Sequence, residues 1–119
     1  MNNLYPSIHL NYANKLLSFY VTQIEYGIEE EGLFSTRSLV PVSSLEKYTY
    51  ESAQASKLEI ALGISEKQVF LMHRKAGPDR FILQKLPPAL TESEGRIFGK
   101  NAARIVKGLP LYQEYENEV

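Results

Sequence analysis

The sequence predicts an α+β fold in which a small antiparallel sheet with a central hairpin is packed by two or three helices. Three observations support this. Apolar residues at helical spacing alternate along the chain with short β-prone runs, two of those runs flank a Gly-Pro turn, and the last helical segment has clear start and stop signals. Since a domain usually has about 100–200 residues, the 119 residues predict a single domain over 1–119.

The first elements expected are a helix and a strand. Residues 11–28 carry apolar side chains three and four positions apart, which predicts an amphipathic helix. The acidic run at 29–31 is interpreted as a solvated turn or helix end. Residues 33–42 are β-prone and close at Pro41, which is typical of an edge strand because proline cannot donate to a neighbouring strand.

A second helix is expected after this strand. Ser43 and Glu46 match a capping box, in which each side chain accepts from a backbone amide at the start of a helix. Residues 53–62 also have a helical pattern, and Gly63 stands at the stop position.

The second half of the chain predicts a hairpin and a final helix. Two β-prone runs flank the turn at 76–79, so we expect a hairpin over residues 68–86. Residues 91–94 form a second capping box before an apolar stripe, and Gly108 ends the pattern.

Composition excludes several classes of protein. The formal charge is −1, from 13 basic and 14 acidic residues, so a generally basic nucleic-acid coat is excluded. There is no cysteine, and two histidines and one aspartate are too few for the usual metal site. No phosphate-binding glycine loop or nucleophile elbow occurs. We therefore expect no enzyme activity, no cofactor and no metal, and, without an apolar span or signal peptide, a cytoplasmic protein.

Four basic residues recur along the last helix, three or four positions apart: Arg96, Lys100, Arg104 and Lys107. One interpretation is a stripe that follows nucleic-acid phosphates. The other is an ordinary solvated face whose charges favour the helix C-terminus.

Residues 57–75 also resemble a helix-turn-helix, with Gly63 at the turn and apolar residues at the positions that lock two helices together. The second helix would direct a polar set toward the major groove and place two basic residues after it: Ser65, Glu66, Lys67, Gln68, Arg74 and Lys75. The competing interpretation is a strand at 69–73 within the hairpin.

Arg74 follows the apolar run that ends at His73. A guanidinium at the end of a buried strand needs an anionic partner, which is either a glutamate or the carboxylate or phosphate of a ligand. His73 itself is typical of a half-exposed strand residue.

Several short stretches together resemble the UTRA domain, the effector-binding half of GntR-type bacterial repressors, which has the chorismate lyase fold. The likeness spans residues 28–116 and rests on residues 31–39, the Leu-Gly-Ile segment that runs from 62 to Arg74, Leu86-Pro87, and the Gly-Leu-Pro-Leu-Tyr stretch at 108–112.

The resemblance implies a regulatory module with a pocket for a small anionic ligand, bound by Arg74, Arg37, His73 and Tyr112, and a homodimer or a partner protein. Two alternatives stay open. One is a small DNA-binding transcription regulator that uses residues 57–75, with duplex DNA as its partner. The other is a protein-interaction module, which the eight tyrosines favour.

Overall fold

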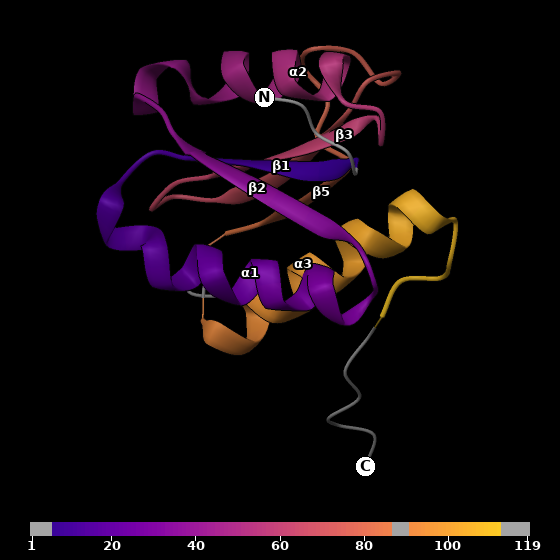
Figure 1. Ribbon diagram of the computed structural model, residues 1–119. Coiled ribbons are helices and arrows are strands. Elements are labelled where there is room, and N and C mark those ends of the chain that lie inside the picture. The colour runs from indigo at the N-terminus through magenta and orange to yellow at the C-terminus, as the bar shows by residue number, and fades with distance from the viewer. Residues whose placement is uncertain (1–5, 87–90, 113–119) are drawn as a thin grey trace.

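The computed structural model describes residues 6–86 and 91–112, which form one five-stranded sheet with helices on both faces (Figure 1). The strands are β1 Ser7–Tyr12, β2 Phe34–Leu39, β3 Ile60–Ile64, β4 Val69–His73 and β5 Leu83–Lys85. The helices are α1 Ser18–Glu30, α2 Leu45–Ala55 and α3 Glu92–Lys107, and short 3₁₀ turns at Lys15–Leu17 and Val42–Ser44 precede the first two.

The strand order is β2-β1-β3-β4-β5. β1 runs parallel to both β2 and β3, whereas β3, β4 and β5 pair in antiparallel fashion. The chain therefore moves outward from β1 to β2 through α1, and back across β1 to β3 through α2. Because such crossovers are right-handed, the two helices must lie on opposite faces of the sheet. The α+β class is confirmed, with a mixed sheet and three helices.

The larger core lies between the sheet and the layer of α1 and α3. Alternate strand residues supply it, among them Ile8, Leu10, Leu62 and Leu71, all fully buried. The opposite face, under α2, holds a smaller cluster built on Leu45, Phe70 and Met72. No helix in the described ranges is long and apolar enough to cross a membrane.

Several sequence predictions are confirmed. The hairpin appears as β4 and β5, and β2 is an edge strand. At the start of α3 the Thr91 hydroxyl accepts from the Glu94 amide at 3.2 Å. The helix ends at Gly108, whose φ of 71° is the left-handed conformation that glycine tolerates.

The predicted helix at 11–28 is wrong in its first part. The segment begins with the end of β1 and a 3₁₀ turn, and the α-helix starts only at Ser18. β1 was missed, although buried Ile8 and Leu10 alternate with the polar His9 and Asn11, which is the two-residue period of a strand.

The predicted helix at 53–62 is also wrong. α2 ends at Ala55, the chain reverses at Glu59 with a φ of 71°, and Ile60–Ile64 is a strand with every residue buried. A central strand covered on both faces has a continuous apolar sequence, which cannot be told from a buried helix by periodicity. The Ser43 capping box does not form either, because α2 is entered through a 3₁₀ turn and Ser44 is its N-cap.

Candidate functional site

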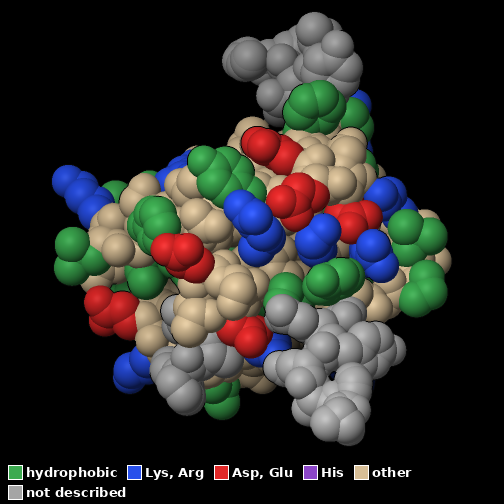
Figure 2. Space-filling model, turned by 90° about the horizontal axis from the view of Figure 1, so that it is seen from below, with side chains coloured by type: hydrophobic (Ala, Val, Ile, Leu, Met, Phe, Trp, Pro, Cys, Tyr) green, Lys and Arg blue, Asp and Glu red, His purple; other side chains and the backbone are tan. Residues whose placement is uncertain are grey.

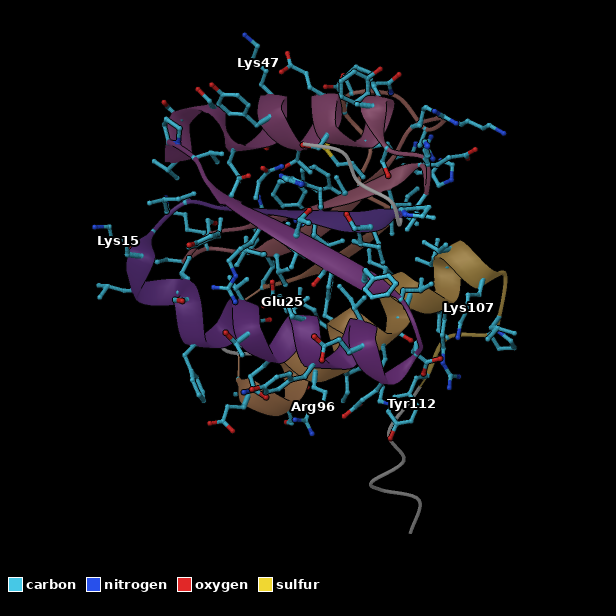
Figure 3. The ribbon with its side chains drawn as sticks, viewed as in Figure 1. Lys15, Glu25, Lys47, Arg96, Lys107 and Tyr112 are labelled. Atoms are coloured by element: carbon cyan, nitrogen blue, oxygen red, sulfur yellow. The ribbon has the colours of Figure 1, made fainter. Side chains whose placement is uncertain are left out.

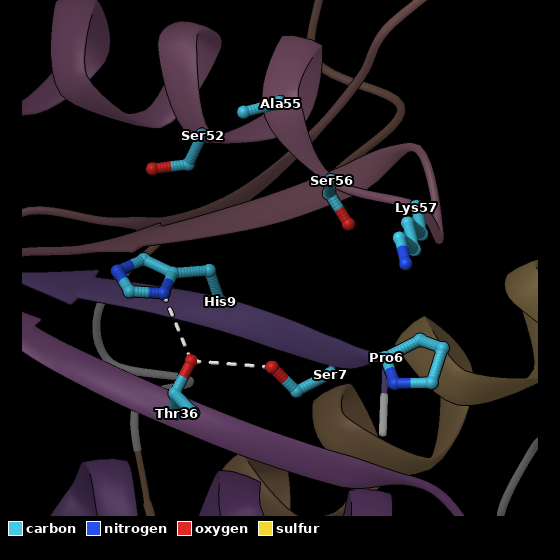
Figure 4. A pocket seen from close by; sticks show the side chains of 8 residues that line it. All are labelled: Pro6, Ser7, His9, Thr36, Ser52, Ala55, Ser56 and Lys57. Carbon is cyan, nitrogen blue, oxygen red and sulfur yellow. Dashed lines mark hydrogen bonds between the residues drawn. The ribbon is translucent and has the colours of Figure 1, made fainter. Parts of the chain in front are cut away.

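The polar half of the sheet face beneath α2 carries a pocket of about 320 Å³ (Figure 4). It lies where the C-terminal end of α2 leaves β1 and β2 uncovered. The residues that line it are Pro6, Ser7, His9, Thr36, Ser52, Ala55, Ser56 and Lys57.

His9 is the centre of this pocket's hydrogen-bond network. It is the register partner of Thr36 in parallel β1 and β2, so the side chains project from the same face. Its Nδ1 lies 2.9 Å from Thr36 Oγ1 and its Nε2 lies 3.0 Å from Ser38 Oγ. Burial lowers the pKa of His9, and a hydrogen bond with Asn11 partly offsets that effect. The ring is therefore a neutral group whose two nitrogens are both engaged.

Asn11 connects this network to α2. Its Nδ2 donates to Ser52 Oγ at 3.1 Å and to Thr49 Oγ1 at 3.5 Å, while the Thr49 hydroxyl donates to the Leu45 carbonyl at 2.7 Å. The pocket thus offers hydroxyl groups, a neutral imidazole and the Lys57 side chain, which suit hydrogen bonding. Across the described ranges, no three His, Cys, Asp or Glu side chains come together as a metal site.

Arg37, a predicted ligand residue, lies on the other face of the sheet. Its guanidinium donates to Glu25 at 2.6 Å, to Thr22 at 2.8 Å and to Ser18 at 3.0 Å, all on α1. The hydrogen bond to Glu25 raises the pKa of Arg37. The group acts as a clamp between β2 and α1.

The other predicted ligand residues lie in two further places. Arg74 donates to Glu59 Oε2 at 2.9 Å, and His73 Nε2 lies 3.6 Å from the same carboxylate. Tyr112, after α3, has its ring 5.2 Å from Lys100 Nζ. The structure therefore brings Arg74 and His73 together around a glutamate and separates them from Arg37 and Tyr112. Their roles in ligand binding stay predictions.

The polar set assigned to a recognition helix lies in the turn between β3 and β4. Ser65 Oγ accepts from the amides of Lys67 and Gln68, and Glu66 accepts from Asn14 Nδ2 at 2.8 Å. Because 69–73 is a strand, the helix-turn-helix interpretation of 57–75, which also included Arg74 and Lys75, is wrong.

The basic stripe of α3 faces the acidic end of α1. On this face basic and acidic side chains lie next to one another (Figure 2), and Arg96 and Lys107 of the stripe are labelled in Figure 3. Lys100 Nζ lies 3.1 Å from Glu30 Oε1. The Glu31 carboxylate pairs with two cations, with Arg104 Nε at 3.1 Å and Lys107 Nζ at 3.2 Å. The Glu31 side chain is only 9% exposed. The stripe is thus an interhelical ion-pair network. The run at 29–31 is a helix end, which is one of the two expectations, but the Glu31 side chain is not solvated.

Three exposed large apolar side chains, which sequence reasoning missed and which we call the apolar corner, lie in the segments that follow β1 and β2. Leu16 is 85% exposed, Val42 66% and Phe19 59%. A shallow hollow of about 540 Å³ adjoins it, lined by Ala13, Asn14, Lys15, Leu39, Val40 and Pro41. Large apolar side chains exposed in segments that follow two adjacent strands are typical of a protein-binding surface. The predicted helix at 11–28 placed Leu16 on its buried apolar face. Because the α-helix starts only at Ser18, Leu16 lies in the preceding 3₁₀ turn and is exposed.

A model of the dehydratase medium subunit family matches residues 5–112. The chain belongs to the dehydratase medium subunit family. No curated protein matches the chain.

Two solved structures share the fold of this family member. One is a diol dehydratase-reactivating factor complexed with ADP and Mg²⁺, with a TM-score of 0.79, 20% identity, and coverage of 91% of this chain and 98% of that one. The other is a glycerol dehydratase reactivase, with a TM-score of 0.78, 21% identity, and coverage of 91% and 97%.

Membership of the dehydratase medium subunit family overturns the UTRA resemblance and, with it, the predicted effector-binding and transcription-regulating function. The short motifs behind the resemblance have structural causes. A β-carbon on Gly63 would lie 2.3 Å from the Phe70 ring, so this glycine makes room in the core under α2. Gly32 and Gly108 adopt positive φ at helix ends.

Proposed function

We propose that the chain is a non-catalytic subunit of a diol or glycerol dehydratase system, of the reactivating-factor type. The observation that carries the proposal is the extent of the likeness. The family model spans residues 5–112, and the fold match covers 98% of a chain of the diol dehydratase-reactivating factor.

Docking onto a larger subunit needs an exposed apolar surface, and the corner formed by Leu16, Phe19 and Val42 supplies one. Its three side chains come from the segments that follow β1 and β2, at the edge of the sheet where these parallel strands end. Polar groups at the adjoining hollow, including Lys15, provide a rim. We assign this corner to the contact with the larger subunit.

Subunit replacement tests the proposal. A diol dehydratase-reactivating factor is reconstituted with this chain in place of its corresponding subunit, and is added with adenine nucleotide and Mg²⁺ to inactivated diol dehydratase. Recovery of dehydratase activity, absent when the chain is omitted, supports the proposal.

The family model also favours a second candidate, the medium subunit of a dehydratase itself. The parallel experiment replaces that subunit of the dehydratase with this chain. Activity in this arm alone identifies the second candidate, and association with neither assembly overturns both.

A further inference from the structure

The two edges of the sheet differ in how they are built. β2, at one edge, has six residues in unbroken parallel register with β1, from Ser7 opposite Phe34 to Tyr12 opposite Leu39. β5, at the other edge, has three residues and contains Lys85. A short edge strand, or one that contains lysine, proline or a bulge, pairs poorly with the strand of another chain. β2 contains no lysine, proline or bulge.

The free side of β2 presents a defined set of backbone groups. The Val40 amide donates to the Tyr12 carbonyl at 2.9 Å, so Val40 points its backbone toward β1. Backbone groups alternate in direction along a strand of a parallel pair. By this alternation, Ser35, Arg37 and Leu39 direct their N–H and C=O groups away from β1.

Arg37, the one charged residue of β2, does not place its charge where it would prevent another strand from pairing with this edge. Arg37 is drawn down onto α1, where Glu25 Oε1 is 2.6 Å from its Nη2 and Thr22 Oγ1 is 2.8 Å from the same atom. Leu39, at the strand's end, is 48% exposed. Among the described residues, the stretch of this edge from Ser35 to Leu39 directs no charge outward and is partly apolar, and an added extended strand would replace water on its backbone groups.

We propose that a second copy of this chain adds to β2 in antiparallel orientation, so that two five-stranded sheets join into one around a two-fold axis. Directly opposite residues of such a pair project their side chains from the same face of the sheet. Even-numbered residues must therefore pair with even-numbered residues and odd with odd, which requires the two-fold axis to pass between a residue and the same residue of the second copy. With Thr36 on the axis, Ser35 lies opposite Arg37 of the second copy, and Leu33 lies opposite Leu39.

This register is self-complementary. The two Ser35–Arg37 pairs each exchange two backbone hydrogen bonds, because their groups point outward. Thr36 meets Thr36 of the second copy, a favourable cross-strand pair. Moving the axis to Arg37 would place the two guanidinium groups opposite each other, which is destabilising.

Because the chain has no cysteine, single-cysteine variants test this register directly. In a non-hydrogen-bonded antiparallel pair the Cα atoms are about 4.5 Å apart, within the range that a disulfide can bridge. We expect Thr36→Cys to form a covalent, dithiothreitol-sensitive dimer under mild oxidation. The matched control is Ser38→Cys on the same strand and face, whose Cα atoms in the two copies would be about 13 Å apart. The expected cross-linking rate is about tenfold lower for this control, since its thiols gain no effective concentration from pairing.

Sedimentation of the purified chain, alone and without any dehydratase component, gives an independent readout. The wild type and Ser35→Ala are expected to sediment as dimers. Ser35→Pro loses only the outward amide, so it is expected to sediment as a monomer, with half the dimer mass and an unchanged circular dichroism spectrum. A monomeric wild type, or equal cross-linking by the two cysteine variants, overturns the proposal. The subunit-replacement experiment has a separate readout, recovery of dehydratase activity, although Leu39 lies both on this edge and beside the hollow at the apolar corner.

Discussion

Gly99 of α3 lies against the backbone of α1 at Ile24: a β-carbon on Gly99 would be 2.0 Å from the Ile24 carbonyl oxygen. The contact is reciprocal, since a β-carbon on Gly27 of α1 would be 2.0 Å from the carbonyl oxygen of Arg96. The two helices thus approach through their glycines, and this close approach brings the acidic end of α1 within reach of the basic stripe of α3.

Gly99→Ala is expected to destabilise the protein by about 3 kcal/mol, because the new methyl group meets backbone that cannot move aside without separating the helices. Urea denaturation followed by circular dichroism measures the change. Ser93→Ala, at an exposed position of the same helix, is the control and should stay within about 0.5 kcal/mol of the wild type. Equal stability of the two variants would show that the helices can move apart freely.

Glu31→Gln is expected to cost about 2 kcal/mol, because the carboxylate accepts charge-assisted hydrogen bonds from Arg104 and Lys107. Burial alone would raise the pKa of Glu31, but these hydrogen bonds outweigh it and lower that pKa. The carboxylate therefore contributes stability above the ordinary glutamate pKa, and the contribution is lost as the pH falls through the lowered value.

Urea denaturation of wild type and Glu31→Gln, from neutral pH down to about pH 3, checks this dependence. The difference in free energy of unfolding should shrink as the pH falls. The control is Glu29→Gln, an exposed neighbour, for which a change below about 0.5 kcal/mol is expected. A difference that stays constant with pH would contradict the assignment.

His9 should make folding sensitive to mild acid. Its pKa is lower in the folded chain than the ordinary value, so the unfolded chain binds the proton more readily. Stability contributed by the neutral ring is complete above about pH 6.5 and declines as the pH falls below that value. Melting temperatures between about pH 7.5 and 5.5 should therefore fall less for His9→Gln than for the wild type. Identical slopes would mean that the ring takes up its proton equally well in both states.

Leu16→Asp combined with Val42→Asp should weaken binding to the larger subunit by at least about tenfold, since a docking surface loses apolar area and gains charge that must be desolvated. The isolated chain should keep its melting temperature, because both side chains are largely exposed. Surface plasmon resonance against the larger subunit of the reactivating factor measures the affinity. Tyr48→Asp, an exposed aromatic residue on α2, is the control. Unchanged affinity of the double variant would exclude the corner as the contact.

Local signals in the sequence predicted the elements that depend on local chemistry. The Thr91 cap and Gly108 bounded α3, and the turn at 76–79 marked the hairpin. The parallel pairing of β1 with β2 and β3 has no local signal, because the paired residues are far apart in the chain. The missed strand β1 and the misassigned strand β3 are therefore neighbours at the centre of the sheet.

The candidate site was harder to predict for the same reason. The pocket joins His9, Thr36 and Ser52 from three separated elements. None of these residues belongs to a recognisable motif, and only the register of β1 against β2 places His9 beside Thr36. Conversely, the guanidinium groups of Arg37 and Arg74 are suited to binding anions, yet each is already paired with a glutamate of the same chain.

The reliance of α1 on α3 has a consequence for synthesis. A ribosome releases α1 well before α3, so the nascent chain carries Val21, Ile24 and Ile28 without their final cover until residue 107 has emerged. Chains cut short before Glu92 would keep that apolar layer open, and should be captured by chaperones or degraded rather than accumulate as a smaller folded protein.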